Sequence, residues 1–338
     1  CQPEELYNGV HIQRFHASTD NMIHRGNKKA YQKLLLDLSK QMDIILTVCP
    51  ETWCTDWAIP LAGKLDCALV MMAHGIHDFR WQNFRDRSAY GILRKLWGNL
   101  RWPPFFAMNW SNIQKFDAII QLHEKDFATQ YFQKHGVKNQ FVLYNAVEDA
   151  FFDADVEKEK QIVNVGTYCT NKNQEKALEA FYKADLPDYK LVLIGSKRNK
   201  YYDQLQTRVE KLEQLYGHRV VELYVGITRD ETVKKVKQSQ IYLLTSISEM
   251  FPVSLIEGMA AGCAWVSTDV GIDRYLPGGV IADKVDDISA TLEQLIAENN
   301  WQQQGEQSRI FALENCRRNK QVERLEKIMH EALKRKER

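Results

Sequence analysis

Two glutamates, Glu249 and Glu257, are the residues whose type and spacing most directly suggest chemistry. They lie in the stretch 241–262, which reads IYLLTSISEMFPVSLIEGMAAG. An apolar run typical of a strand is followed by a polar loop that carries Glu249. A helical pattern then begins at Pro252, carries Glu257 and stops at Gly262. A strand, a loop and a helix N-terminus direct unpaired N–H groups and the positive end of the helix dipole to one place, which suits a phosphate or diphosphate. We expect the two carboxylates to bind hydroxyl groups on either side of that anion.

Two glutamates at a fixed spacing also occur in ordinary strand–helix units, where each is a solvated surface acid. The full string goes further, because it resembles the Glu-x7-Glu signature of retaining nucleotide-sugar glycosyltransferases of the glycogen-synthase-like group (family 4, glycosyl transferases group 1). The resemblance rests on Ser246, Glu249, Phe251, Pro252, Leu255, Ile256, Glu257, Met259, Ala260 and Gly262. It covers most of the chain and is strongest over residues 162–269. It implies an α/β protein with the GT-B fold, in which two Rossmann-like domains face a cleft.

The resemblance also implies roles for residues of this stretch. Glu257 takes the position of the glutamate that accepts hydrogen bonds from the ribose hydroxyls. Glu249 takes the position of the glutamate near the hydroxyls of the transferred sugar. The turn between them is expected to present its backbone to sugar and phosphate, and it comprises Phe251, Pro252, Val253, Ser254 and Leu255.

A second motif, VGTYCTNKN at residues 165–173, directly follows an apolar run. It looks like the family's strand–Gly–Arg–loop–Lys element, with Gly166 at the glycine and Lys172 at the lysine. Lys172 would neutralise charge on the leaving nucleotide; otherwise it is an exposed surface lysine. Thr167 occupies the arginine position, and this departure removes one bidentate phosphate clamp. Gly226 and Ile227 end another strand, where this family's backbone often contacts the nucleobase.

Histidine 74 follows a strand pattern in the sequence MMAHG. In the family a histidine at this place commonly reaches the donor sugar, although a lone histidine is as often a packed one. His74 and His77 form an H-x-x-H pair without a third ligand of defined spacing, so we expect no metal there. The sequence 153–155 (DAD) superficially matches the metal-binding DxD of the other large glycosyltransferase fold, but it lies in an acidic segment and not at a strand end. We expect no metal or cofactor; the nucleotide-diphosphate sugar is a substrate.

Composition describes a globular chain. Of its 338 residues, 44% are hydrophobic and 26% are charged, and the net charge of +1 gives no whole-chain field for nucleic acid. No apolar run is long enough to span a bilayer and no signal-peptide pattern is present. The seven cysteines lack the paired spacing of a zinc site, which favours reduced thiols and a cytoplasmic location.

The second half of the chain alternates strand and helix patterns. Strands are predicted at residues 162–165, 191–194, 220–225, 241–244 and 264–267, and helices at 174–183, 202–216 and 230–238. This alternation predicts βαβ units and a parallel sheet. Because ligands of such sheets bind at the carboxyl ends of the strands, we expect the chemistry in the loops that follow Val165, Ile194, Tyr224 and Leu244.

The first half repeats this style less completely. Strands are predicted at residues 10–15, 43–48, 69–73, 116–122 and 140–144, and helices at 29–41 and 125–134. Residues 145–159 look like a linker, and helices are expected at 287–297, 301–314 and 319–336. We predict a first domain at 1–145, a nucleotide-sugar-binding domain at 146–315, and a last helix at 316–338. That helix would pack back on the first domain through Val322, Leu325, Ile328, Met329 and Leu333.

Measured against the family, the first domain lacks its opening strand, glycine-rich loop, first helix and second strand. The chain also begins at Cys1, so we expect an N-terminally truncated piece whose activity is open.

Residues 80–110 combine four tryptophans with basic residues. Leu93, Leu96, Trp97 and Leu100 share one helical face with Arg94, Lys95 and Arg101 beside it, and Arg80, Arg85 and Arg87 precede it. This pattern is typical of an interfacial helix for an anionic membrane or a lipid-linked acceptor, or of aromatic residues packed under a long loop. Nucleic-acid binding is not expected, because the basic patch is local.

We therefore predict a retaining, metal-independent glycosyltransferase that moves a sugar from a nucleotide-diphosphate sugar to a glycan, lipid-linked or other hydroxyl acceptor. It would be cytoplasmic, with peripheral contact at the membrane's cytoplasmic face. A non-catalytic GT-B partner subunit, which Thr167 favours, and a sugar-nucleotide epimerase are the alternatives. We expect Glu257→Ala to weaken nucleotide binding, and Glu249→Ala or Lys172→Ala to slow transfer.

Overall fold

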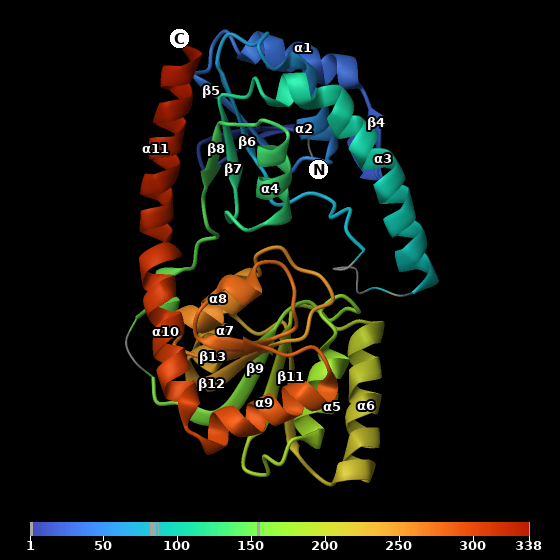
Figure 1. The fold of residues 1–338 in the computed structure, drawn as a ribbon, viewed down its shortest axis with the longest axis vertical. Helices are drawn as coiled ribbons and strands as arrows, with labels where there is room; N and C mark the ends of the chain where they lie inside the picture. The colour runs from blue at the N-terminus through green and yellow to red at the C-terminus, as the bar shows by residue number, and fades with distance from the viewer. Residues whose placement is uncertain (1–2, 82–85, 87, 154–155, 338) are drawn as a thin grey trace. The chain divides into compact units, whose positions relative to one another are not determined.

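Parallel β-sheets organise both halves of the chain (Figure 1). The computed structural model describes residues 3–81, 86, 88–153 and 156–337. It divides into unit 1, residues 1–143 and 323–338, and unit 2, residues 144–322. Compared with the boundaries expected from sequence, residues 144–145 and 316–322 belong to unit 2, and most of the last helix belongs to unit 1.

Unit 2 contains a six-stranded parallel sheet in the order β11-β10-β9-β12-β13-β14. Its strands are β9 (Glu159–Val165), β10 (Lys190–Gly195), β11 (Val220–Val225), β12 (Ser239–Leu244), β13 (Ala264–Ser267) and β14 (Gly279–Ile281). Its helices are α5 (Gln174–Lys183), α6 (Lys200–Tyr216), α7 (Arg229–Gln238), α8 (Val253–Ala260), α9 (Val285–Ala297) and α10 (Asn300–Asn315). The predicted α/β alternation is confirmed, although β14 was not foreseen.

The predicted linker at 145–159 is wrong. Phe151 and Phe152 are 0% and 7% exposed. Phe151 ends a short 3₁₀ helix, η2 (Asp149–Phe151), Phe152 follows it, and β9 begins at Glu159. Burial of these aromatic side chains contributes favourable free energy that a solvated linker would not provide. The start of this segment is therefore part of the unit 2 core.

Unit 1 contains a four-stranded parallel sheet in the order β5-β6-β7-β8. Its strands are β5 (Ile44–Val48), β6 (Ala68–Met72), β7 (Ala118–Gln121) and β8 (Gln140–Val142). Its helices are α1 (Lys28–Leu38), α2 (Trp53–Ala58), α3 (Ala89–Ile113) and α4 (Phe127–Lys134), with the 3₁₀ turn η1 (Ile59–Leu61) after α2. The last helix, α11 (Arg318–Lys336), buries Ile328 and Ala332 in one cluster with the sheet residues Ala68, Val70, Ala118 and Ile120. Of the five apolar positions predicted to pack, Val322 is 49% exposed.

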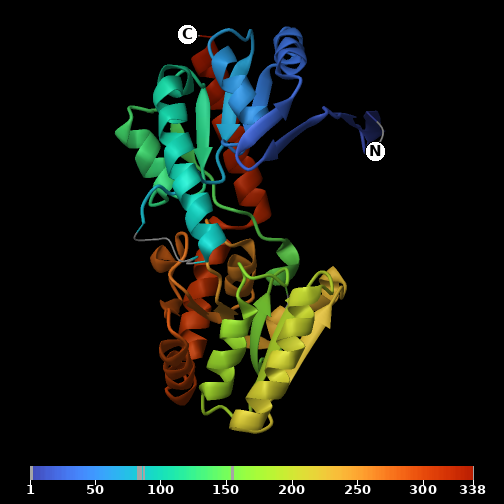
Figure 2. The same ribbon diagram turned by 90° about the vertical axis from the view of Figure 1, so that its right-hand side faces the viewer.

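The predicted strand at 10–15 is only partly right, because it lies outside the parallel sheet. Residues Val10–Gln13 form β2, which pairs antiparallel with β1 (Glu4–Tyr7). A second hairpin joins β3 (Ala17–Asp20) and β4 (Ile23–Gly26). Asn8 and Gly9 have φ angles of 48° and 82°, and two left-handed residues at Asn-Gly are typical of a tight hairpin turn. Figure 2 shows the first hairpin, near the N label, extending away from the unit 1 sheet.

Helix α3 has one buried and one exposed face. Trp102, Phe106 and Ile113 are at most 1% exposed and lie in the unit 1 core. The other face carries large apolar side chains that are between 42% and 73% exposed: Tyr90, Leu93, Leu96, Trp97, Leu100 and Met108. Lys95, expected beside this face, is 5% exposed and donates to the carbonyl oxygen of Asp78. Arg85 and Arg87 lie outside the described residues. No helix in the described part of the chain is long and apolar enough to cross a membrane.

Candidate functional site

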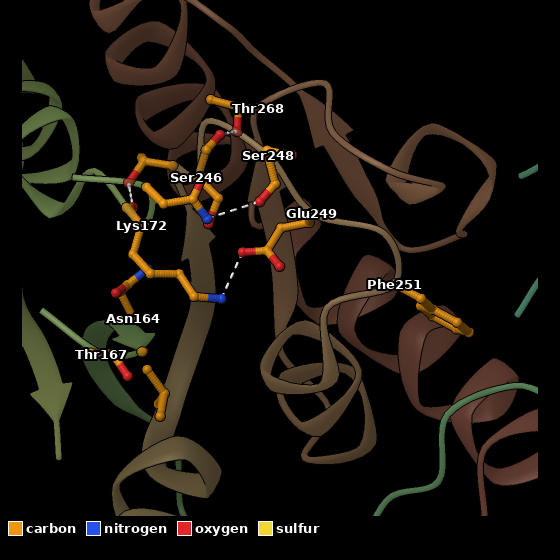
Figure 3. Close-up of polar contacts among 12 residues, drawn as sticks. Asn164, Thr167, Lys172, Ser246, Ser248, Glu249, Phe251 and Thr268 are labelled. Atoms are coloured by element: carbon orange, nitrogen blue, oxygen red, sulfur yellow. Dashed lines mark hydrogen bonds and ion pairs between the residues drawn. The ribbon is translucent and has the colours of Figure 1, made fainter. Parts of the chain in front are cut away.

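The loops that follow β9 and β12 bring Lys172 and Glu249 together. Lys172 Nζ lies 2.6 Å from Glu249 Oε1, and the side chains are 23% and 14% exposed (Figure 3). The aliphatic stem of Lys172 passes over Gly166, where a Cβ atom would lie 3.4 Å from Lys172 Cγ and Cδ. These loops are neighbours because β9 and β12 are adjacent in the sheet, and the carboxyl ends of parallel strands meet at one edge.

Hydrogen bonds fix the two loops to each other. The Ile247 N–H donates to the Asn171 carbonyl at 2.7 Å, and Asn171 Nδ2 donates to the Ser248 carbonyl at 3.0 Å. Thr245 Oγ1 donates to the Asn173 carbonyl at 2.9 Å. Both residues of the ion pair therefore stand on backbone that is held in place from the opposite loop.

A third loop, which follows β13, packs against the backbone of Glu249 and Met250. Gly271 has φ +53°, and a Cβ there would lie 2.2 Å from the Met250 carbonyl oxygen and 3.0 Å from that of Glu249. Asp273 is 0% exposed, and Oγ of Ser267 donates to its Oδ2 at 2.7 Å. Burial raises the Asp273 pKa well above its ordinary value, because loss of hydration favours the protonated form of a carboxyl group.

Helix α8 presents free backbone donors next to this pair of loops. The predicted position of Pro252 is off by one: it is the N-cap, with ψ 113°, and the helix begins at Val253. Within the described residues, the Val253 and Ser254 N–H groups donate to no protein acceptor. The Leu255 N–H is different, because it donates to the Pro252 carbonyl at 3.1 Å.

Two other side chains of the predicted turn are structural. Phe251 is 4% exposed and packs edge-to-face on Tyr144, with ring centroids 5.6 Å apart. Leu255 is 0% exposed. Figure 3 shows Phe251 pointing away from the ion pair of Lys172 and Glu249.

Glu257, in α8, is bound by an arginine. Arg229 Nη2 lies 2.5 Å from Glu257 Oε1 and 3.3 Å from Glu148 Oε1. The Glu257 side chain is only 7% exposed. Burial raises its pKa, while Arg229 acts in the opposite direction.

Thr167 and the residues after β11 lie at the same edge of the sheet. Thr167 is exposed, and its carbonyl accepts a hydrogen bond from Gln174 Nε2 at 3.1 Å. Gly226 has φ +63° and its N–H donates to the Gly195 carbonyl at 3.0 Å, while Ile227 is half-buried. These positions lie at the carboxyl ends of β9 and β11, where ligands of parallel sheets bind.

His74 belongs to unit 1, where it follows β6. It is exposed, and partial burial of its ring lowers its pKa. His77 is engaged differently, since its Nε2 lies 2.9 Å from Asn99 Oδ1. Among residues 3–81, 86, 88–153 and 156–337, no three His, Cys, Asp or Glu side chains gather as a metal site requires. The DAD sequence lies partly outside those ranges, since Asp155 is not described.

The segment that contains these residues matches a known sequence family. Residues 146–311 match the family described as "Glycosyl transferases group 1". The matched segment contains Lys172, Glu249 and Glu257. The chain is also 27% identical over 172 residues to the Xenopus laevis protein named GDP-Man:Man(3)GlcNAc(2)-PP-Dol alpha-1,2-mannosyltransferase, a match that covers 44% of this chain and 34% of that protein. The chain thus spans about a third of the length of the curated relatives it matches.

Solved structures show the fold of this chain. Sucrose-phosphate synthase from Thermosynechococcus elongatus aligns over 98% of this chain and 85% of its own, with a TM-score of 0.68 and 14% identity. Anabaena HepE, solved in complex with UDP, aligns over 89% of this chain and 82% of its own, with a TM-score of 0.67 and 12% identity. The predicted GT-B fold is confirmed.

Sequence reasoning missed three residues of this candidate site: Arg229, Glu148 and Asp273. Arg229 carried one signal, because Thr228 precedes it and Glu231 follows as a capping box that starts α7 at the end of β11. Glu148 lies in the segment that was interpreted as a linker. Nothing local distinguishes Asp273 from a surface aspartate.

Proposed function

We propose that this chain transfers a sugar from a nucleotide-diphosphate sugar to a hydroxyl group of a glycan or lipid-linked acceptor, with retention of the anomeric configuration. The observation that carries the proposal is the ion pair of Lys172 and Glu249 at the sheet edge where α8 begins. A cation and open N–H groups beside a carboxylate suit a ligand that joins a diphosphate to a polyhydroxylated sugar.

Each residue has a task in this mechanism. Lys172 and the N–H groups of Val253 and Ser254 stabilise negative charge that develops on the leaving diphosphate. Glu249 accepts hydrogen bonds from hydroxyls of the transferred sugar and keeps Lys172 in place. Glu257 binds the ribose. These positive groups support a transfer that needs no metal, in which the leaving phosphate accepts the proton of the acceptor hydroxyl on the face where that hydroxyl attacks.

The acceptor proposal has its own support. The name of the Xenopus relative includes Man(3)GlcNAc(2)-PP-Dol, which favours a lipid-linked acceptor here. Helix α3 favours it too, because its exposed face is apolar and no Asp or Glu occurs between residues 88 and 116. Such a face suits contact with an anionic bilayer, so we place the protein peripherally on the cytoplasmic face of a membrane.

A non-catalytic nucleotide-sugar-binding subunit is the second candidate. It is favoured by Thr167, an exposed neutral side chain where the resemblance places a phosphate-binding arginine. Binding without turnover would identify this role, whereas release of nucleotide without a glycosylated product would indicate hydrolysis or an epimerase.

Two experiments test the proposal. The first is calorimetric titration with UDP, GDP and ADP. The second assays transfer from the corresponding sugar nucleotides to a lipid-linked oligosaccharide fraction. We expect one nucleoside diphosphate to bind and its sugar to appear on the acceptor with unchanged anomeric configuration. A double variant, Lys172→Ala with Glu257→Ala, should lose both. Wild-type turnover by this double variant would refute the assignment.

A further inference from the structure

Arg229 is held by three groups of unit 2 and remains partly open to solvent. Its guanidinium contacts Glu257 at 2.5 Å and Glu148 at 3.3 Å, and its Cζ lies 4.9 Å from the ring centroid of Phe151. The Arg229 side chain is nevertheless 43% exposed. As the first residue of α7, it is fixed at its backbone by the capping box of Thr228.

Glu257 depends on this arginine for its charge. A carboxylate that is 7% exposed has lost most of its hydration, and loss of hydration favours the protonated form. The charged or titratable groups around it are Arg229 from α7, Glu148 before η2, and Tyr242 from β12. Glu148 opposes ionisation, although Arg318 of α11 lies 3.9 Å from it and offsets part of its charge. Arg229 is the group in direct contact that favours the carboxylate.

We propose that Arg229 is a positioning residue for the nucleotide: it keeps Glu257 charged and oriented, so that the ribose hydroxyls can donate to the carboxylate. This inference rests on the proposed function, in which Glu257 binds the ribose. A hydroxyl donates a stronger hydrogen bond to a carboxylate than to a neutral carboxyl group. Because Glu257 Oε1 already contacts Arg229, Oε2 is the atom assigned to the ribose.

The test is calorimetric titration of UDP and GDP into the full chain from pH 6.5 to pH 9. It compares wild type, Arg229→Gln, Arg229→Lys and the control Lys234→Gln, which removes a positive charge from an exposed position of the same helix. Arg229→Gln should bind nucleotide more weakly at pH 6.5 than at pH 9, because each unit by which the Glu257 pKa exceeds the solution pH lowers its ionised fraction about tenfold. Its affinity should recover as the pH rises, while wild type and Lys234→Gln change little.

Arg229→Lys and an added variant, Glu257→Gln, keep the test decisive. Arg229→Lys retains the charge, so it should bind more weakly but keep the flat pH profile of wild type. Glu257→Gln should bind weakly at every pH, and adding Arg229→Gln to it should cost no more than about twofold, because residues that act through one group are not additive.

The outcomes separate the inference from the proposed function. Wild-type affinity of Arg229→Gln, or an equal loss at every pH, would overturn the inference. Failure of wild type to bind UDP, GDP or ADP would instead refute the proposed function. Far-ultraviolet circular dichroism of each variant identifies any that does not fold, and Arg229→Lys then carries the comparison.

Discussion

Nζ of Lys172 and Oε1 of Glu249 lie 2.6 Å apart although 77 positions separate them in the sequence. Both side chains are mostly buried, at 23% and 14% exposed, so solvent screens this ion pair less than a surface pair. The two residues act as one unit, because each holds the other in the orientation that a donor would meet. A change in either is therefore also a change in the electrostatic environment of its partner.

Lys172→Ala should reduce kcat/KM for sugar transfer by at least about 100-fold. The variant removes the cation that stabilises the leaving diphosphate, and the loss of one preorganised stabilising group costs about 3 kcal/mol. Steady-state kinetics with the sugar nucleotide identified by titration checks this value. Lys211→Ala, an exposed lysine of α6, is the control and should behave as wild type. A variant with wild-type kcat/KM would remove Lys172 from the mechanism.

Gly271→Ala should destabilise the protein by at least about 2 kcal/mol and weaken donor binding. The added Cβ would meet the Met250 carbonyl oxygen at 2.2 Å, and φ is +53°, so the loop that carries Glu249 must move. Gly217→Ala is a matched control, since Gly217 has φ +85° with nothing within 4 Å. It carries only the cost of the left-handed backbone, about 1 kcal/mol. Chemical denaturation of both variants measures the difference, and equal losses would show that the contact with Met250 costs nothing.

Glu51→Gln should change how stability depends on pH. Burial raises the Glu51 pKa to about 8, and the His77 N–H donates to its Oε1 at 2.9 Å. Because the folded-state pKa lies above the unfolded value, this group stabilises the fold fully only below the unfolded pKa of about 4.3, and that stability is lost as the pH rises toward 8. The amide has no proton to lose. Denaturation at pH 6 and pH 9 should therefore show a loss smaller by about 3 kcal/mol in Glu51→Gln than in wild type.

The same experiment with Glu210→Gln, an exposed position of α6, should give the wild-type pH profile. If Glu51→Gln also gave the wild-type dependence of stability on pH, the Glu51 carboxyl would ionise as freely in the folded chain as in the unfolded one.

Replacing Leu93 and Leu100 of α3 by glutamate should abolish binding to vesicles that contain anionic lipid. Both side chains are more than 60% exposed, and each buried leucine contributes about 1.5–3 kcal/mol to partitioning, so the loss should exceed about 100-fold. Co-sedimentation with phosphatidylcholine vesicles, with and without phosphatidylglycerol, measures it. Leu215→Glu, at a position 73% exposed on α6, should bind as wild type does. Absence of wild-type binding to the anionic vesicles would contradict the membrane proposal.

Local sequence was sufficient for most elements of unit 2. The predicted bounds of β11, α5 and β13 coincide with Val220–Val225, Gln174–Lys183 and Ala264–Ser267, because hydrophobic period and flanking breakers act over a few residues. The hairpin at Asn8-Gly9 carried an equally local signal that was overlooked, so the strand after it was assigned to the wrong sheet.

The candidate site was likewise only partly predictable from the local sequence. The motif around Glu249 and Glu257 and the loop with Lys172 are readable in the chain, because turn and helix-cap residues lie within one short segment. The partners of these residues are not readable. Arg229 reaches Glu257 only when α7 and α8 pack together, and Lys172 reaches Glu249 only because β9 and β12 are neighbours in the sheet. The pKa of Asp273 is likewise raised only when the surrounding loops exclude water from it. Such contacts depend on which strands lie side by side, and that order follows from packing of the whole core, which no local pattern encodes.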